Sequence, residues 1–164
     1  MLLLVSDANV LIDVKAGDLL APMFSLNYEF GVPDILFQYE LRERHADFLS
    51  MGLQTIALSE LVVAVADSYA EKHTKPSRMD VFALALAKDR QCPLLTGDAA
   101  LRKAAEIEQV PVMGTVWLLQ QMLQQKRITV AVARAAVDKM RLEGSRLPWH
   151  KLEIMFGTFE SDIR

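Results

Sequence analysis

The sequence predicts an α/β protein, in which helices cover both faces of a central parallel sheet of about five short strands to give a three-layer α/β/α arrangement. The first observation is the opening run Leu2–Val5, which is continuously apolar and soon meets the carboxylate Asp7. A strand that is covered on both faces needs such a run, because neither face meets water. The second observation is that short apolar runs alternate with segments of helical periodicity as far as residue 125, a pattern typical of repeated strand–helix units.

Five segments are expected to form the strands. Each is a short run of apolar or β-branched residues bounded by polar residues, glycine or proline. After the opening run they are Phe30–Val32, Gln54–Leu58, Pro93–Thr96 and Val110–Val112.

Helices are expected between these strands. They are predicted over residues 9–15, 19–24, 34–44, a segment after Ser59, 79–87, 99–106 and 115–125. Asp34, Ser59, Asp98 and Thr115 are candidate N-caps, because their side chains can accept a hydrogen bond from an unpaired N–H of the first turn.

Two of these helices carry further signals. Ser77 and Asp80 have the spacing of a capping box, and the helix that follows is apolar almost all round, so it is expected to be buried. The helix after Ser59 has apolar residues at helical spacing that are expected to join the core: Leu61, Val62, Val65, Ala66 and Tyr69.

The chain divides at about residue 125. Residues 1–125 are expected to form the complete α/β unit, and residues 126–164 a helical C-terminal extension packed on or beside it. The charge divides at the same place: ten basic residues stand against sixteen acidic ones in the first part, a balance of −6, and eight against five in the second, a balance of +3.

The sequence favours a soluble protein of the cytoplasm. The single cysteine, Cys92, excludes an internal disulfide framework and fits a reducing compartment. The opening apolar run has four residues, which is too short for a signal peptide or a membrane span. A membrane association is therefore not expected.

Four carboxylates are candidates for one site. Asp7 and Asp98 each follow a predicted strand, and Asp80 begins the helix that precedes the fourth strand. Because the carboxyl ends of parallel strands lie at one end of the sheet, these side chains are expected to converge. Glu40 falls on the apolar face of its predicted helix, where an unpaired carboxylate is costly, while Glu43 lies nearby and stays an alternative.

Each of these acids also has a structural explanation. Asp7 and Asp98 could act only as N-caps, Asp80 only as part of its capping box, and Glu40 could be a partly exposed helical glutamate. If they do converge to within about 5 Å, each charged pair repels by roughly 3 kcal/mol at an effective dielectric constant near 20, so cations would be needed. Oxygen-only sites select hard ions such as Mg²⁺ or Mn²⁺, which could activate a water for attack on a phosphodiester.

The motifs around these acids resemble the PIN-domain nucleases. The resemblance rests on Ser6–Ile12, on the segment Val32–Leu41, on Asp80 in a buried alanine-rich helix, and on Leu94–Leu101, all in matching order and spacing. It covers about residues 2–125. The family includes the toxin ribonucleases of bacterial and archaeal toxin–antitoxin pairs.

The resemblance implies a PIN-like parallel sheet flanked by helices and a hydrolase that cleaves RNA with Mg²⁺ or Mn²⁺. It also implies that Asp7, Glu40, Asp80 and Asp98 hold the metal and carry the catalysis, with Asn9 and Thr96 orienting them through hydrogen bonds. A separately encoded antitoxin and a homodimer are the protein partners it implies. Residues 114–117 and the helical tail resemble one subgroup whose members are themselves only predicted nucleases.

Two other functions stay open at this stage. A haloacid-dehalogenase-like phosphatase also begins with a strand that ends in aspartate, but that family has a second aspartate where this chain has Asn9. A catalytically degenerate PIN fold that binds RNA or a protein is the other alternative.

Because the chain carries a net charge of −3, RNA must be attracted locally. The loop before Asp80 offers Lys72, His73, Lys75 and Arg78, of which Lys75 and Arg78 are the candidate RNA-binding residues. The extension offers a second basic set: Lys126, Arg127, Arg134, Lys139, Arg141, Arg146 and Lys151.

Overall fold

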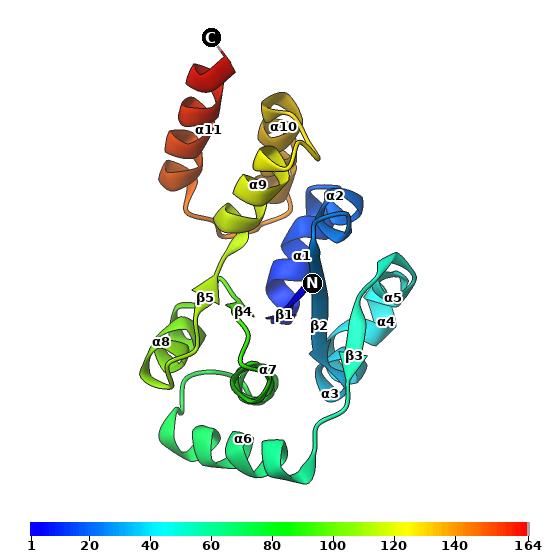
Figure 1. The fold of residues 1–164 in the computed structure, drawn as a ribbon, viewed down its shortest axis with the longest axis vertical. Coiled ribbons are helices and arrows are strands. Elements are labelled where there is room, and N and C mark those ends of the chain that lie inside the picture. The colour runs from blue at the N-terminus through cyan, green and yellow to red at the C-terminus, as the bar shows by residue number, and fades with distance from the viewer. Residues whose placement is uncertain (164) are drawn as a thin grey trace.

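The structure is a computed structural model that describes residues 1–163, and it confirms the predicted architecture of a five-stranded parallel sheet between layers of helices (Figure 1). Neighbouring strands pair in the order β3-β2-β1-β4-β5, and every pairing is parallel. The strands are β1 (Leu2–Ser6), β2 (Tyr28–Pro33), β3 (Gln54–Ile56), β4 (Leu94–Leu95) and β5 (Val112–Met113).

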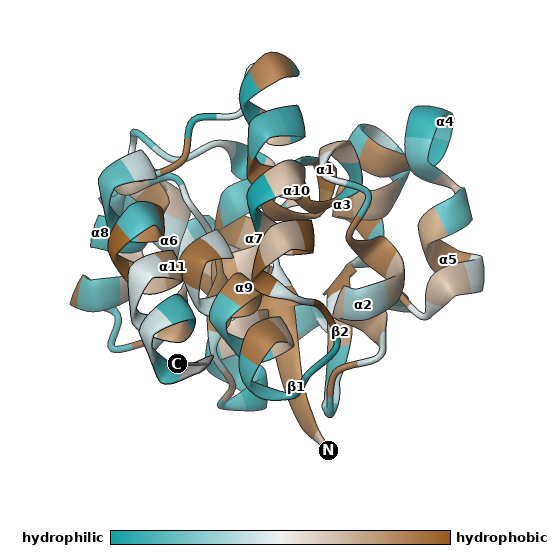
Figure 2. Ribbon diagram, turned by 90° about the horizontal axis from the view of Figure 1, so that it is seen from above, coloured by the Kyte–Doolittle hydropathy of each residue, from teal (hydrophilic) through white to brown (hydrophobic). Residues whose placement is uncertain are grey.

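The first strand occupies the centre of the sheet, as its composition predicts. Leu4 and Val5 are fully buried, and Figure 2 shows β1 as an apolar strand beneath the helices. Its partners on either side are β2 and β4.

Helices lie on both faces of the sheet. In Figure 1, α7 lies on one side with α6 beyond it, and α1, α2, α9 and α10 lie on the other. The helices are α1 (Ala8–Ala16), α2 (Leu20–Phe24), α3 (Asp34–Leu36), η1 (Phe37–Leu41), α4 (Arg42–His45), α5 (Asp47–Met51), α6 (Glu60–Lys72), α7 (Arg78–Arg90), α8 (Ala99–Ile107), α9 (Thr115–Gln124), α10 (Val130–Leu142) and α11 (Trp149–Ile163).

Helix α7 is buried on both of its sides, which confirms the prediction from its composition. Residues 81–87 are all buried, since the sheet covers one face and α6 covers the other. A small second core between the two helices contains Val62, Ala66, Val81, Phe82 and Ala85. The prediction that Leu61 belongs to the core is wrong, because it lies on the outer face of α6 and is 72% exposed.

The segment predicted as a single helix over residues 34–44 is interrupted. After α3 the backbone forms η1, a π-helical turn over Phe37–Leu41, and only then continues as α4. In a π turn each N–H binds the carbonyl five residues back rather than four, so the side chains that follow are rotated. Asp34 is the first helical residue rather than the N-cap, which is Pro33.

Two other boundaries differ from the sequence prediction. Val110 does not belong to β5, because its N–H binds the carbonyl of Ala105 at 2.8 Å and completes the turn that ends α8. Gly114, and not Thr115, is the N-cap of α9; Thr115 is its first residue and is buried. The predicted caps Ser59 and Asp98 are confirmed.

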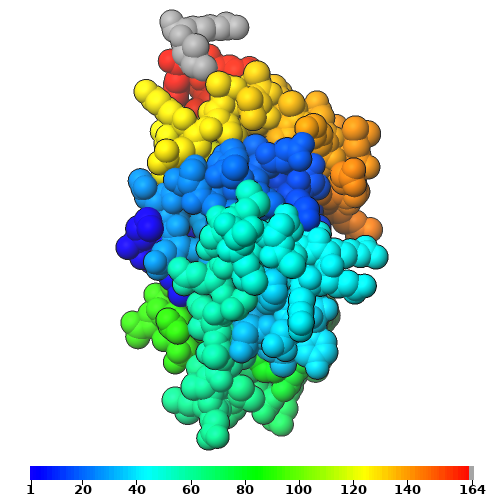
Figure 3. Space-filling model, turned by 90° about the vertical axis from the view of Figure 1, so that its right-hand side faces the viewer, coloured from blue at the N-terminus to red at the C-terminus, as the bar shows by residue number. Residues whose placement is uncertain are grey.

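The C-terminal helices share the main core with the sheet-bearing part. Figure 3 shows the yellow-to-red helices seated directly on the blue N-terminal elements. Buried residues of α10 and α11 belong to the same apolar cluster as β1 and α1: Ala133, Ala136, Val137, Met140, Leu152, Met155 and Phe156.

Close backbone contact holds α10 against α1. A Cβ added to Gly17, at the end of α1, would lie 2.6 Å from Cε of Met140 and 3.1 Å from the carbonyl oxygen of Ala136. Beside this contact, Lys139 Nζ donates to Asp18 at 2.6 Å. Gly17 therefore allows the extension to approach the α/β unit.

No helix within residues 1–163 is both long and apolar enough to cross a membrane.

Candidate active site

The sheet order creates a crevice at the carboxyl ends of β1 and β4. The chain proceeds from β1 through β2 to β3 on one side, then returns to place β4 and β5 on the other. Such a switch point is where open parallel sheets bind ligands, because the connections leave the two strands in opposite directions. Asp7 follows β1 here, and Thr96 follows β4.

Asp7 is the most buried acid of the crevice, with 1% of its surface exposed. It is the N-cap of α1: its Oδ1 accepts a hydrogen bond from Val10 N at 2.9 Å, and its Oδ2 accepts one from Thr96 Oγ1 at 2.6 Å. Burial raises the pKa of Asp7 from 3.8 to about 6, although these two hydrogen bonds act to lower it. The charges of Asp80 and Asp13 raise it further.

Thr96 fixes the geometry between the two strand ends. It is fully buried, and its hydroxyl donates to Asp7 while accepting from Asp98 N at 3.0 Å. Asp98 Oδ2 in turn accepts from Leu101 N at 2.8 Å and so caps α8. The two aspartates are thereby joined through one threonine.

Asp80 makes the predicted capping box with Ser77 at the start of α7. Asp80 N donates to Ser77 Oγ at 3.1 Å, and Ser77 N donates to Asp80 Oδ2 at 3.2 Å. Burial raises the pKa of Asp80 despite these hydrogen bonds, and the charge of Asp98 raises it further. Asp80 therefore helps to cap α7 and at the same time interacts with the charge of a neighbouring acid.

Glu40 lies in the π turn, and the prediction that it sits on a buried apolar face is wrong. It is exposed, whereas Phe37 and Leu41 in the same turn are buried. Its pKa is raised by partial burial and then by the charge of Asp80, so its carboxylate is within electrostatic reach of the crevice. Glu43 lies in α4 and is exposed.

The four acids thus influence one another in a chain. Asp80 raises the pKa of Asp7 and of Glu40, and Asp98 raises that of Asp80. An all-oxygen set with this mutual repulsion suits a hard divalent cation. Within residues 1–163, however, no three acidic, histidine or cysteine side chains converge closely enough to coordinate one ion.

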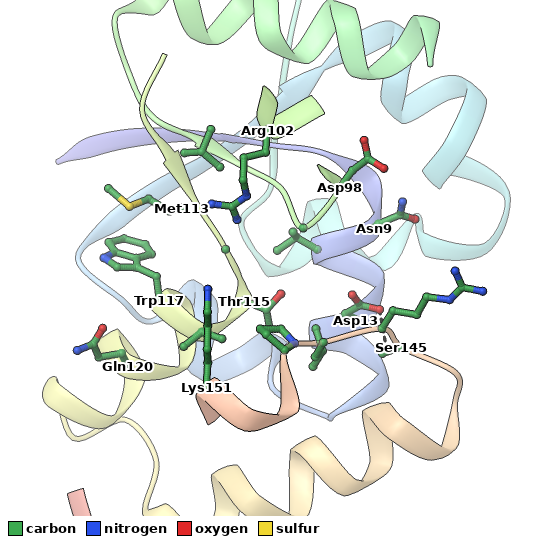
Figure 4. A pocket seen from close by; sticks show the side chains of 18 of the residues that line it. Asn9, Asp13, Asp98, Arg102, Met113, Thr115, Trp117, Gln120, Ser145 and Lys151 are labelled. Atoms are coloured by element: carbon green, nitrogen blue, oxygen red, sulfur yellow. Dashed lines mark hydrogen bonds between the residues drawn. The ribbon is translucent and has the colours of Figure 1, made fainter. Parts of the chain in front are cut away.

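Beside the acids opens a cleft of about 920 Å³ between the α/β unit and the extension (Figure 4). Asn9 and Asp98, one of the four acids, line the cleft, and Arg102, Arg146 and Lys151 are also in its wall. The side chain of Asn9 makes no hydrogen bond to any other part of the described chain, so it is available to a ligand.

Two residues of this region were not anticipated from the sequence. Asp13 lines the cleft and accepts a hydrogen bond from Ser145 Oγ at 2.7 Å, and burial raises its pKa. Its position four residues after Asn9 on one helical face was the available signal. Arg102 likewise stands four residues after Asp98.

The basic loop before Asp80 is largely paired within the protein. Lys72 Nζ and His73 Nε2 both contact Glu108, at 3.1 and 3.2 Å, and Arg78 pairs with Asp67. Arg78 also lies over the ring of Phe82, at 4.8 Å from its centroid. Lys75 makes no ion pair with any side chain in the part of the chain that the structure describes.

Comparison with known proteins places the chain beside one family model and one solved structure. Residues 3–155 match the family model described as DUF3368: PIN domain. Among solved structures, the fold is similar to that of a PilT N-terminus domain protein, SSO1118, from the hyperthermophilic archaeon Sulfolobus solfataricus P2. The identity is 15% over 75% of this chain and 94% of that one, with a TM-score of 0.49. No curated protein matches.

Proposed function

The chain belongs to the PIN-domain family, whose members are in general nucleases, and we propose that it is a metal-dependent endoribonuclease that hydrolyses phosphodiesters of single-stranded RNA. One observation carries the proposal: three aspartates and a glutamate come from four separate segments near the switch point of the sheet, where Asp80 raises the pKa of Asp7 and of Glu40 and Asp98 raises that of Asp80. Membership of this family also favours a nuclease over the phosphatase alternative.

The residues that would hold Mg²⁺ or Mn²⁺ are Asp7, Glu40, Asp80 and Asp98. When bound, such an ion lowers the pKa of a water and stabilises negative charge on the phosphate. Asp7 suits this role because Val10 and Thr96 hold its carboxylate in one orientation. Thr96 acts as a positioning residue, since its hydroxyl couples Asp7 to the backbone of Asp98.

The other groups would orient RNA in the crevice. Asn9 has a free amide beside Asp98 and could hydrogen-bond a ribose or phosphate oxygen. Lys75 and Arg78 lie just before Asp80 in the chain and could contact the RNA backbone at the rim. Arg78 would first have to leave Asp67, so Lys75 is expected to contribute more.

Cleavage of a labelled single-stranded RNA in Mg²⁺ or Mn²⁺, with EDTA as the metal-free reference, tests the proposal. Asp7→Asn and Asp80→Asn should each abolish cleavage, because each removes a carboxylate from the cation site. Asp138→Asn is the matched control, since Asp138 is exposed on α10. Wild-type rates in either active-site variant would contradict the assignment.

A degenerate module that binds RNA or protein without cleaving it is the second candidate. The observation in its favour is that no three potential ligands converge within residues 1–163. A Mn²⁺ titration separates the two functions: the nuclease predicts saturable binding that Asp7→Asn weakens, and the degenerate module predicts no difference between the two proteins.

We also infer a cellular role as the toxin of a toxin–antitoxin pair in the cytoplasm, acting as a homodimer. The support is the resemblance of the acidic motifs to toxin ribonucleases. Expression of the wild-type chain should arrest growth, expression of Asp7→Asn should not, and the product of a neighbouring gene should relieve the arrest.

A further inference from the structure

The cleft beside the acids has a wall that residues 1–125 alone do not supply. The loop after α10 and the start of α11 form one side, and the beginnings of α1 and α9 form the other. Its volume of about 920 Å³ is in the upper part of the range that is typical of small-ligand sites.

Three cations line this cleft: Arg102 on α8, Arg146 in the loop and Lys151 on α11. Within residues 1–163 none of the three makes an ion pair with a carboxylate. The basic loop before Asp80 differs in this respect, since Lys72, His73 and Arg78 are already paired there. An anion entering the cleft would therefore meet cations without displacing a carboxylate from them.

The turn that follows α10 brings Arg146 to the wall of the cleft. Gly144 follows Glu143, the C-cap of α10, and has φ +90°, a conformation that favours glycine. In this turn Gly144 N binds Arg141 O and Ser145 N binds Met140 O. Ser145 then donates its hydroxyl to Asp13 on α1 at 2.7 Å, shown as the dashed line in Figure 4. The next residue, Arg146, is thereby held beside α1, the helix that carries Asn9.

Arg102 links the cleft to the acidic crevice. Its Nη2 donates to the carbonyl of Thr96 at 3.4 Å, and the hydroxyl of the same Thr96 donates to Asp7. In Figure 4, Arg102 and Lys151 extend into the cleft from opposite sides. A polyanion could therefore run from the acids past Arg102 to the extension.

Part of the remaining wall is apolar and includes an indole. Trp117 lines the cleft together with Met113, Leu147 and Pro148, and its ring is tilted against Tyr28 with centroids 5.3 Å apart. Unpaired bases of single-stranded nucleic acids bind by stacking on or packing against such surfaces, while phosphates bind Arg and Lys.

From these observations we infer that the cleft is a subsite for single-stranded RNA, in which Arg102, Arg146 and Lys151 contact phosphates flanking the scissile one and Trp117 contacts a base. The inference rests on the proposed function for the identity of the nucleic acid. It assigns the C-terminal extension a direct part in substrate binding.

Binding of a short fluorescent single-stranded RNA to Asp7→Asn protein in EDTA tests the subsite without cleavage. Arg146→Ala/Lys151→Ala should weaken binding, and its affinity should depend less on salt. Each lost phosphate contact changes the slope of log affinity against log salt by about 0.7. Between about 50 and 200 mM salt the parent should therefore lose about sevenfold more affinity than the double variant.

Lys103→Ala/Arg127→Ala is the matched control, because it removes two exposed cations that do not line the cleft. An unchanged slope in the cleft variant, or an equal change in the control, would overturn the phosphate contacts. In Trp149→Phe protein, where Trp117 is the single tryptophan, RNA should quench the fluorescence; no change would overturn the base contact.

The two proposals fail in different ways. If the wild-type protein binds RNA through the cleft but never cleaves it in Mg²⁺ or Mn²⁺, the nuclease proposal fails and the subsite stands. If it cleaves RNA while the cleft variant binds and cleaves like the parent, the subsite fails and the nuclease stands.

Discussion

Replacing Asp7 by Asn should stabilise the metal-free protein at neutral pH. The pKa of Asp7 is raised from 3.8 to about 6 by folding, so the folded state binds the proton more tightly than the unfolded state. The stability that this proton provides is fully present below pH 3.8 and is lost as the pH rises through about 6. At 1.36 kcal/mol for each pKa unit, the loss amounts to about 3 kcal/mol.

Asparagine does not ionise, so Asp7→Asn avoids this loss, but it disturbs one hydrogen bond. Its carbonyl can still accept from Val10 N, whereas its amide N–H₂ would face the hydroxyl of Thr96 that now donates to Oδ2. That mismatch costs about 1 kcal/mol, which leaves a net gain of about 2 kcal/mol at pH 7.5. For a protein of this length the gain corresponds to about 4 to 8 °C in Tm.

Urea denaturation in EDTA at pH 4 and pH 7.5 measures the effect. The advantage of Asp7→Asn should be small or absent at the lower pH and should reach its full size at the higher one. The exposed Asp138→Asn serves as the control and should show no such growth. An advantage that is independent of pH, or a loss of stability at pH 7.5, would refute the conclusion that burial makes ionisation of Asp7 costly.

The remaining predictions concern the site and the packing of the extension. Glu40→Gln should reduce cleavage far more than Glu43→Gln, because Asp80 raises the pKa of Glu40; the reverse ranking in a cleavage assay would assign the role to Glu43. Thr96→Val should lower Mn²⁺ affinity by about 10- to 100-fold, and Thr96→Ser should largely restore it; equal affinities for Val and Ser would remove the hydroxyl from the site. Gly17→Ala should destabilise the protein by about 1 kcal/mol, because its Cβ would lie 3.1 Å from the backbone carbonyl oxygen of Ala136 as well as against Met140. Gly157→Ala, in open space within α11, should stabilise the protein by about 0.5 to 1 kcal/mol, and urea titrations that give both changes the same sign would contradict this packing.

The layers of the fold follow from patterns that are local in the sequence. The continuous apolar run before Asp7 predicts a central strand, and the apolar composition of residues 81–87 predicts a helix covered on both sides, as found. The interruption at Phe37–Leu41 could not be predicted, because the same residues would also satisfy an α-helix. There the backbone takes the wider π turn, in which Phe37 and Leu41 are both buried, in place of the regular α-helical turn.

The candidate site was predictable to the extent that it lies at strand ends. Asp7, Thr96 and Asp98 are brought together by the pairing of β1 with β4, and their position after those strands is visible in the sequence. The cleft was not predictable, because it depends on how the extension docks on α1. That docking is set by Gly17 against Met140 and by Asp13 with Ser145, contacts between residues more than 100 positions apart.

The two outermost strands limit how copies of the chain can associate. β3 has three residues and β5 has two, so each offers few unpaired backbone groups along its open side. Two molecules that join their sheets into one need a longer free strand to form a ladder of intermolecular hydrogen bonds. Any association of two copies is accordingly expected to use helical surfaces, where side chains rather than main-chain groups determine which partner is accepted.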